Sequence, residues 1–182
     1  MYRSSTLCIP RNKILCVLSA YICTQSRNLK MQWKPNTTVA AVIEKDGKFL
    51  LVEELIEDEL VFNQPAGHLE KGETLLDAVK REVLEETAFD FEPKALVGIY
   101  LYQNKSNKNI TYLRFCFHGS CIKKYDERKL DHGIIRTVWM SKKEIEENKR
   151  MRSQMVLKCI EDYKNGNSFP LTLLNFSPNN HE

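Results

Sequence analysis

The sequence predicts an α+β domain, and three observations support this fold class. Two β-branched and apolar runs, Thr38–Ile43 and Lys48–Glu53, are separated by an Asp-Gly pair, which is a strong signal for a β-hairpin. Apolar residues recur at helical spacing over Leu75–Thr87. A second amphipathic pattern over Gln154–Lys164 ends at an Asn-Gly pair, which is typical of a helix C-terminus. Strands and helices therefore alternate along a chain of 182 residues, a length that suits one domain.

Further strands are predicted where short apolar or β-branched runs lie between turn residues. They are Leu60–Asn63, Leu96–Tyr102, Tyr112–Ile122 and Arg136–Trp139. Gln64-Pro65-Ala66-Gly67 is predicted as a loop before the first helix, because proline and glycine interrupt strands. Ser141 is predicted to cap a short helix, with Glu144 completing a capping box.

The helix over Leu75–Thr87 carries the residues that suggest a function. Its start is predicted at Thr74, whose hydroxyl can accept the free backbone N–H of Asp77. Leu75, Val79 and Val83 recur every four residues, so they form a stripe that must face a core. The helix is therefore expected to pack firmly and to hold its polar residues in fixed directions.

Three acidic residues, Glu82, Glu85 and Glu86, are predicted to lie along one edge of this stripe. They occupy the last turns of the helix, where the macrodipole disfavours negative charge, and they also repel one another. A solvated acidic face is the commoner interpretation of such a run. A bound cation would compensate the charge, and Mg²⁺, with Mn²⁺ as an alternative, suits oxygen ligands with no histidine or cysteine nearby.

Neighbouring residues favour the metal site over the solvated face. Arg81 can reach Glu85 one helical turn later, and Glu73 offers a second carboxylate to the same guanidinium group. Gly67 and Gly72 supply a preceding segment whose backbone can approach a metal ion or a phosphate closely.

These residues resemble the Nudix box, the motif of hydrolases that act on a nucleoside diphosphate linked to another group. The matching residues are Gly67, Glu73, Arg81, Glu82, Val83, Glu85, Glu86 and Phe89. Ala88 stands where the family usually has glycine, a residue that ends the helix in a left-handed conformation. Alanine adopts that conformation at a cost of about 1 kcal/mol, so a different loop is expected after the helix.

The resemblance implies the fold and the roles of the site residues. The expected fold is an α/β/α sandwich with a mixed β-sheet between helices. Glu82, Glu85, Glu86 and the Gly67 carbonyl are expected to hold the metal ions. Glu82 or Glu85 is expected to orient or deprotonate the attacking water, with Arg81 and Glu73 in support.

From Met31 to about Phe176 the chain also resembles the NudJ branch of the family, which are phosphatases. The similar segments begin at Lys34, Phe62 and Phe169. This branch implies hydrolysis of nucleoside tri- and diphosphates and of thiamine-pathway diphosphates (hydroxymethylpyrimidine diphosphate and thiamine diphosphate), with release of orthophosphate. Motifs of the ADP-ribose, diadenosine polyphosphate and coenzyme A hydrolases are absent. Two alternatives stay open: a Nudix pyrophosphatase that releases pyrophosphate or a nucleoside monophosphate, and a non-catalytic Nudix module that binds a nucleotide.

Other residues were weighed for the site. Tyr100, Tyr102, Phe115 and Trp33 could stack on a base, but aromatic residues on strands more commonly pack in the core. His68 is interpreted as structural, and Asp131 and His132 as exposed turn residues. None of them is placed in the predicted site.

Charge and cysteine content limit the ligands and the cellular compartment that are expected for the protein. Residues 1–30 hold five basic residues and no acidic one; taking these five from 27 leaves 22 basic against 24 acidic residues, a net charge of −2. The remainder therefore gives no electrostatic argument for binding nucleic acid. The six cysteines include no C-x-x-C pair, which favours reduced thiols in a cytoplasmic protein. A small-molecule substrate and a monomeric enzyme are expected.

Residues 1–30 are interpreted as a start-site artefact or a disordered extension, with a targeting or membrane-associated segment as the alternative. The apolar stretch Ile14–Cys23 in this segment is too short to span a bilayer. Residues 31–176 are the predicted Nudix domain, and 177–182 form a C-terminal tail.

Overall fold

The computed structural model describes residues 33–104 and 107–175. The chain divides into two compact units, Met1–Lys34 and Pro35–Glu182, and the fold below is that of the second unit. The predicted extension over residues 1–30 and the predicted tail over 177–182 lie outside the described residues.

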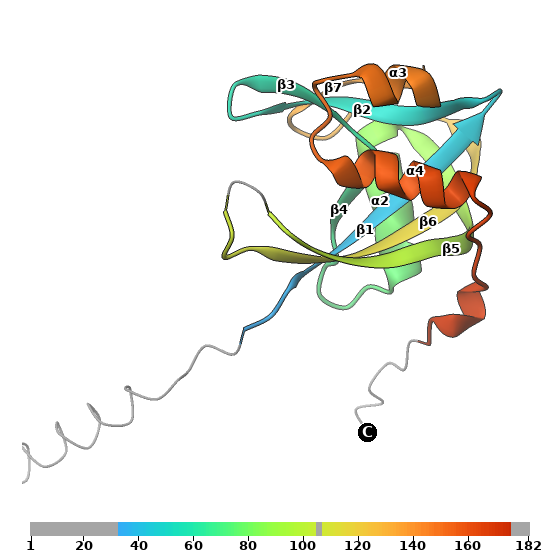
Figure 1. Cartoon of the computed structure of the whole chain (residues 1–182). Helices are drawn as coiled ribbons and strands as arrows, with labels where there is room; N and C mark the ends of the chain where they lie inside the picture. The colour runs from blue at the N-terminus through green and yellow to red at the C-terminus, as the bar shows by residue number, and fades with distance from the viewer. Residues whose placement is uncertain (1–32, 105–106, 176–182) are drawn as a thin grey trace, which may run out of the picture. The chain divides into compact units, whose positions relative to one another are not determined.

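Along the described residues of this unit, four strands are followed by a helix, three further strands and two helices (Figure 1). In chain order the elements are β1 (Asn36–Lys45), β2 (Lys48–Ile56), β3 (Glu59–Asn63), β4 (Ala66–His68), α2 (Leu75–Thr87), β5 (Phe89–Gln103), β6 (Thr111–Lys124), β7 (Ile134–Ser141), α3 (Lys142–Glu147), α4 (Gln154–Lys164) and the 3₁₀ turn η1 (Leu171–Leu173).

The strands form a mixed sheet in the order β3-β2-β1-β6-β5, with β4 paired to β1 and β7 paired to β2. The pairing of β1 with β6 is parallel, and the other strand pairs are antiparallel. The first half of β1 pairs with β4, whereas its end pairs with β2. Strand β1 therefore joins two parts of the sheet, and β4 lies at the start of β1.

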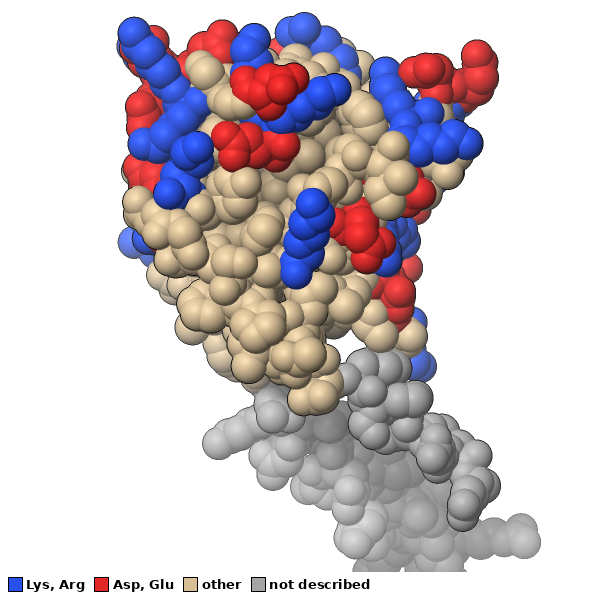
Figure 2. Space-filling model, turned by 90° about the vertical axis from the view of Figure 1, so that its right-hand side faces the viewer, with Lys and Arg blue, Asp and Glu red and all other residues tan. Residues whose placement is uncertain are grey.

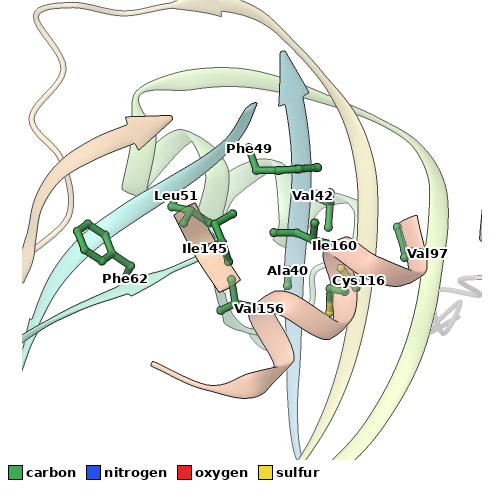
Figure 3. Close-up of a cluster of buried hydrophobic side chains, with 11 residues drawn as sticks. Ala40, Val42, Phe49, Leu51, Phe62, Val97, Cys116, Ile145, Val156 and Ile160 are labelled. Atoms are coloured by element: carbon green, nitrogen blue, oxygen red, sulfur yellow. The ribbon is translucent and has the colours of Figure 1, made fainter. Parts of the chain in front are cut away.

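Helices cover both faces of the sheet, because the side chains of β1 alternate between two cores. Val39, Ala41 and Ile43 pack in the core that includes Val79 and Val83 of α2. Ala40 and Val42 point the other way into a core with residues of α3 and α4. Figure 3 shows this second core, in which Ile145, Val156 and Ile160 meet Leu51 and the β1 side chains. The predicted α/β/α sandwich with a mixed sheet is confirmed.

Several predicted local features are present. Asp46 and Gly47 both have positive φ, 52° and 75°, as a tight hairpin turn requires. Ser141 and Glu144 form the expected capping box at the start of α3. Helix α4 runs from Gln154 to Lys164, as predicted.

The predicted loop over Gln64-Pro65-Ala66-Gly67 is wrong in part, because Ala66 and Gly67 belong to β4. This short strand exists through its pairing with Thr38–Ala40 of β1 rather than through its own sequence pattern. Strand β5 also begins earlier than predicted, at Phe89 instead of Leu96, because it pairs along almost its whole length with β6. Both differences arise from long-range pairing, which a local pattern does not contain.

The surface of the domain mixes charges of both signs. On the face that Figure 2 shows, Lys and Arg side chains lie interspersed with Asp and Glu side chains. Within the described residues, no helix has the length and apolar content needed to span a membrane.

Candidate active site

Helix α2 is fixed at both ends and along its apolar face. Thr74 caps its start, and the Thr74 hydroxyl accepts the N–H of Asp77 at 3.1 Å. Ala78, Val79 and Val83 are fully buried against the sheet. Ala88 ends the helix with φ 59° and ψ 17°, and its N–H donates to the Leu84 carbonyl at 3.0 Å. Alanine thus adopts the left-handed conformation that glycine would adopt without strain, at a cost of about 1 kcal/mol, and the expectation of a different loop after the helix stays a prediction.

Glycine 67 lets Glu82 of α2 approach β4. A Cβ atom at position 67 would overlap the Glu82 carboxylate, far inside the 3.0 Å that real Cβ atoms keep from their neighbours. The Glu82 carboxyl group therefore lies directly against the β4 backbone. The absence of a side chain at Gly67 thus leaves room for the Glu82 carboxylate in this position.

Arg81 holds the acidic residues of the site in place. Its Nε and Nη2 donate to the two carboxylate oxygens of Glu73 at 3.0 and 2.7 Å. Its Nη1 donates to Glu82 Oε1 at 2.8 Å and to Glu85 Oε2 at 3.2 Å. Nη2 also donates to the His68 carbonyl of β4 at 3.0 Å. The predicted contacts of Arg81 with Glu73 and Glu85 are both present, and they tie three carboxylates and one strand to a single guanidinium group.

Glu86 lies deeper than the other acidic residues of the site. Its Oε2 accepts the backbone N–H of Ala66 at 2.9 Å, which links α2 to β4 a second time. Burial raises the pKa of Glu86 to about 8, and the nearby charges of Glu82 and Glu54 act in the same direction. The Ala66 hydrogen bond opposes this rise. Burial also raises the pKa of Glu82, whereas the hydrogen bond from Arg81 lowers the pKa of Glu73.

The residues fit a divalent cation by their chemistry, although they do not form a closed ligand set. Among residues 33–104 and 107–175, no three His, Cys, Asp or Glu side chains are gathered closely enough to hold a metal ion. One oxygen each of Glu82, Glu85 and Glu86 is directed to Arg81 or Ala66. The second oxygen of each makes no hydrogen bond within the described residues, and the last turn of α2 has no basic residue. Hard oxygen donors with uncompensated negative charge are what Mg²⁺ or Mn²⁺ requires.

The structure adds residues that the sequence analysis missed. Glu54 on β2 is buried, and both of its carboxylate oxygens accept Arg152 Nη1, at 3.0 and 2.8 Å. The charges of Glu54 and Arg152 both act on Glu86, so this ion pair lies beside the α2 glutamates. Adjacent Glu53 pairs with Arg136 at 2.6 Å and Arg150 at 2.9 Å. The signal in the sequence was a pair of acidic residues at the end of an apolar strand.

The aromatic residues that were left out of the predicted site differ in their surroundings. Tyr100 packs against the α4 core, and its hydroxyl donates to Asp162 at 2.9 Å. Phe115 packs against the α2 core, and Trp33 is exposed. Tyr102 instead stacks on Tyr112, with ring centroids 5.3 Å apart.

The three polar candidates outside the helix lie near α2. His68 is exposed, and its carbonyl is bound by Arg81. The backbone N–H of Asp131 donates to the Glu85 carbonyl at 2.9 Å, so the turn before β7 packs on the end of α2. His132 is exposed next to it. No side-chain contact links these residues to the glutamates.

The comparison with known proteins decides the family. The family model described as the NUDIX domain matches residues 33–158, which is more than half of the chain. The chain belongs to the Nudix hydrolase family. This Nudix chain is 37% identical over 142 residues to "Phosphatase NudJ" of Escherichia coli strain K12, an alignment that covers 78% of the chain and 92% of the relative. The same values hold for "Phosphatase NudJ" of Shigella flexneri.

Solved structures agree with this assignment. A NUDIX hydrolase from Nitrosomonas europaea is 49% identical and superimposes with a TM-score of 0.77, covering 79% of this chain and 98% of that structure. The NUDIX domain of Shewanella oneidensis NrtR, complexed with ADP ribose, superimposes with a TM-score of 0.61 at 16% identity, covering 87% of this chain and 99% of that domain. At this identity the second likeness shows the fold alone. Members of the Nudix hydrolase family act on phosphoric anhydrides, and the residues matched by the family model include the glutamates of α2.

Proposed function

We propose that this Nudix hydrolase is a metal-dependent phosphatase that removes the terminal phosphate of nucleoside tri- and diphosphates and of the thiamine-pathway compounds hydroxymethylpyrimidine diphosphate and thiamine diphosphate, releasing orthophosphate. The observation that carries the proposal is the arrangement of Arg81, Glu82 and Glu85 against β4, with every charged position of the motif retained and engaged. The similarity to NudJ over 92% of that relative supports the phosphatase branch.

Hydrolysis of a diphosphate is slow because its negative charge repels nucleophiles. Glu82, Glu85 and Glu86, with the Gly67 carbonyl, are the groups that would hold Mg²⁺ or Mn²⁺. When bound, the cation would neutralise phosphate oxygens and lower the pKa of bound water. Arg81 fixes the directions of Glu82 and Glu85 through its hydrogen bonds, so the carboxylates do not have to reorganise during the reaction.

Glu82 or Glu85 orients the attacking water and accepts its proton in this proposal. Accessibility favours Glu85, because its side chain is 35% exposed and that of Glu82 is 11% exposed. A general base must lie within hydrogen-bond reach of the water that it activates. Glu85 Oε1 makes no hydrogen bond within the described residues, so it is free to accept one from water.

The test is product analysis on the full chain with Mg²⁺. Nucleoside di- and triphosphates, hydroxymethylpyrimidine diphosphate, thiamine diphosphate and ADP-ribose would each be incubated with the protein, and orthophosphate and pyrophosphate would be measured separately. Orthophosphate from the nucleotides or the thiamine compounds is the expected result. Pyrophosphate or a nucleoside monophosphate as the first product would move the chain to another Nudix activity. No turnover of any substrate would favour a nucleotide-binding module.

Two further predictions accompany this proposal. Cys116, Cys121 and Cys159 are free thiols, which supports a reducing compartment such as the cytoplasm. The monomeric state stays a prediction.

A further inference from the structure

Arg114, near the start of β6, has a buried guanidinium group without a hydrogen-bond or ion-pair partner among the described residues. The residue is 6% exposed, and its Nε and Nη1 are fully buried with no hydrogen bond. Nη2 also makes no hydrogen bond within the described residues, but unlike Nε and Nη1 it is not fully buried and is therefore accessible to solvent. No acidic side chain of the described residues forms an ion pair with Arg114. Buried charges in proteins are usually paired. The described residues supply no anion for Arg114, so a bound anion is the expected partner.

The strand register places Arg114 close to the glutamate site. Arg114 is the partner of Thr38 on β1, and Thr38 is in turn the partner of His68 on β4. Strand β4 is the one that contacts Glu82 through Gly67 and Glu86 through Ala66. Two strand spacings, about 10 Å, therefore separate the Arg114 backbone from β4. The Thr38 hydroxyl beside Arg114 is also buried and unpaired.

Two tyrosines complete the surroundings of Arg114. The Arg114 guanidinium lies 5.5 Å from the centre of the Tyr102 ring, which stacks on Tyr112. Burial raises the pKa of Tyr102, and the charges of Arg114 and Arg152 oppose that rise. Arg152, which is hydrogen-bonded to Glu54, lowers the pKa values of both Tyr102 and Glu86. On β6, Phe115 packs in the α2 core and Cys116 in the α4 core, so Arg114 points to the α4 face of the sheet, two strands from the β4 residues that Glu82 and Glu86 contact.

We propose that Arg114 binds the phosphate that stays on the product, the group next to the bond that is hydrolysed. The proposal rests on the phosphatase activity proposed above. A phosphate fits better than a ring carbonyl, because it brings negative charge and several acceptor oxygens to a guanidinium group that lacks both. The Thr38 hydroxyl can donate to the same phosphate, and the Tyr102–Tyr112 pair lies where the organic part of the substrate continues. Arg114 is thus a substrate-binding residue and acts on the leaving group.

The test is product binding by the full chain in metal-free buffer, measured by calorimetry or NMR titration. AMP and thiamine monophosphate are the probes, and adenosine and thiamine are the matched probes without phosphate. Arg114→Met is expected to weaken binding of the two monophosphates by about 10- to 100-fold and to change adenosine and thiamine binding by less than twofold. Arg114→Lys keeps the charge and is expected to recover part of the loss. Arg128→Met, at an exposed arginine of the loop before β7, is the control and should bind all four probes as the wild type does.

Thermal unfolding separates this role from a structural one. Arg114→Met should be at least as stable as the wild type, because the lost charge has no partner in the protein. Equal weakening of probes with and without phosphate, unchanged binding of the monophosphates, or wild-type binding of AMP no tighter than adenosine would each overturn the proposal. The wild-type product assay is independent of these measurements. Release of pyrophosphate there would refute the phosphatase proposal while the binding difference at Arg114 could still be observed.

Discussion

Gly67→Ala is a sharp test of how β4 and α2 build the site. The new Cβ would overlap the Cδ and both oxygens of the Glu82 carboxylate, so the carboxylate must retreat by about 1 Å or more. The carboxylate is the flexible end of the Glu82 side chain. Its displacement forces a strained rotamer and breaks the 2.8 Å hydrogen bond from Arg81 Nη1. We expect a loss of about 1 to 2 kcal/mol in the free energy of unfolding. Displacement of a catalytic group by this distance should lower kcat/KM on the order of 100-fold.

A double-mutant cycle isolates the Gly67–Glu82 contact. Orthophosphate release and thermal unfolding would be measured for Gly67→Ala, for Glu82→Ala and for the double variant. Glu82→Ala removes the atoms that the new methyl group meets, so Gly67→Ala should cost little stability in that background. A stability loss of the same size in both backgrounds would refute the contact, and a Gly67→Ala variant with wild-type turnover would refute the requirement for it.

Three further predictions concern the charged groups. Glu85→Gln should lower orthophosphate release to background while the melting temperature stays near the wild-type value, because the volume is kept and the charge is lost; wild-type turnover would contradict the assignment of Glu85. Arg81→Lys should lose about 2 kcal/mol of stability and most of the activity, because an ammonium group cannot reproduce the hydrogen bonds to Glu73, Glu82, Glu85 and the His68 carbonyl; denaturant unfolding and initial rates would measure both. The hydrogen bond from Arg136, and then that from Arg150, holds the pKa of Glu53 below its ordinary value of 4.5, so these ion pairs stabilise the fold above about pH 4.5 and are lost as the pH falls through the lowered pKa. Glu53→Gln should therefore flatten the melting temperature between pH 3 and pH 6, and an unchanged slope would show that these ion pairs add no stability.

The sequence predicts the parts of this fold that local chemistry determines. Thr74 and the apolar spacing after it define α2 to the residue, and the Asp-Gly pair defines the β1–β2 hairpin. The hairpin between β2 and β3 gave no such signal, because Glu57 and Asp58 adopt positive φ without glycine or asparagine. Strand β4 and the first residues of β5 form only through pairing with distant strands, so they were assigned as loop or left out.

The site shows the same division between local and long-range information. The glutamates and Arg81 share one helix face, so their contacts follow from spacing along the chain. Arg114 gave a weaker signal, because it is a single charged residue inside an apolar strand. Its surroundings depend on which strands flank β6. Arg152 precedes α4 and meets Glu54 of β2 only in the folded chain. Sequence spacing therefore predicted the contacts within α2, and the tertiary structure was needed for the surroundings of Arg114 and Arg152.

Charge balance favours the proposal that the candidate site binds a cation. Arg81 is hydrogen-bonded to the carboxylates of Glu73, Glu82 and Glu85, and Arg152 to that of Glu54, whose charge raises the pKa of Glu86. Neither guanidinium group donates to Glu86, which instead accepts a hydrogen bond from the Ala66 backbone. Glu86 therefore has no charged hydrogen-bond partner among the described residues, and its burial raises its pKa to about 8. A fold selected only for stability would place a basic residue in the last turn of α2, so the acidic residues there are expected of a helix that gives up stability for the cation binding proposed above.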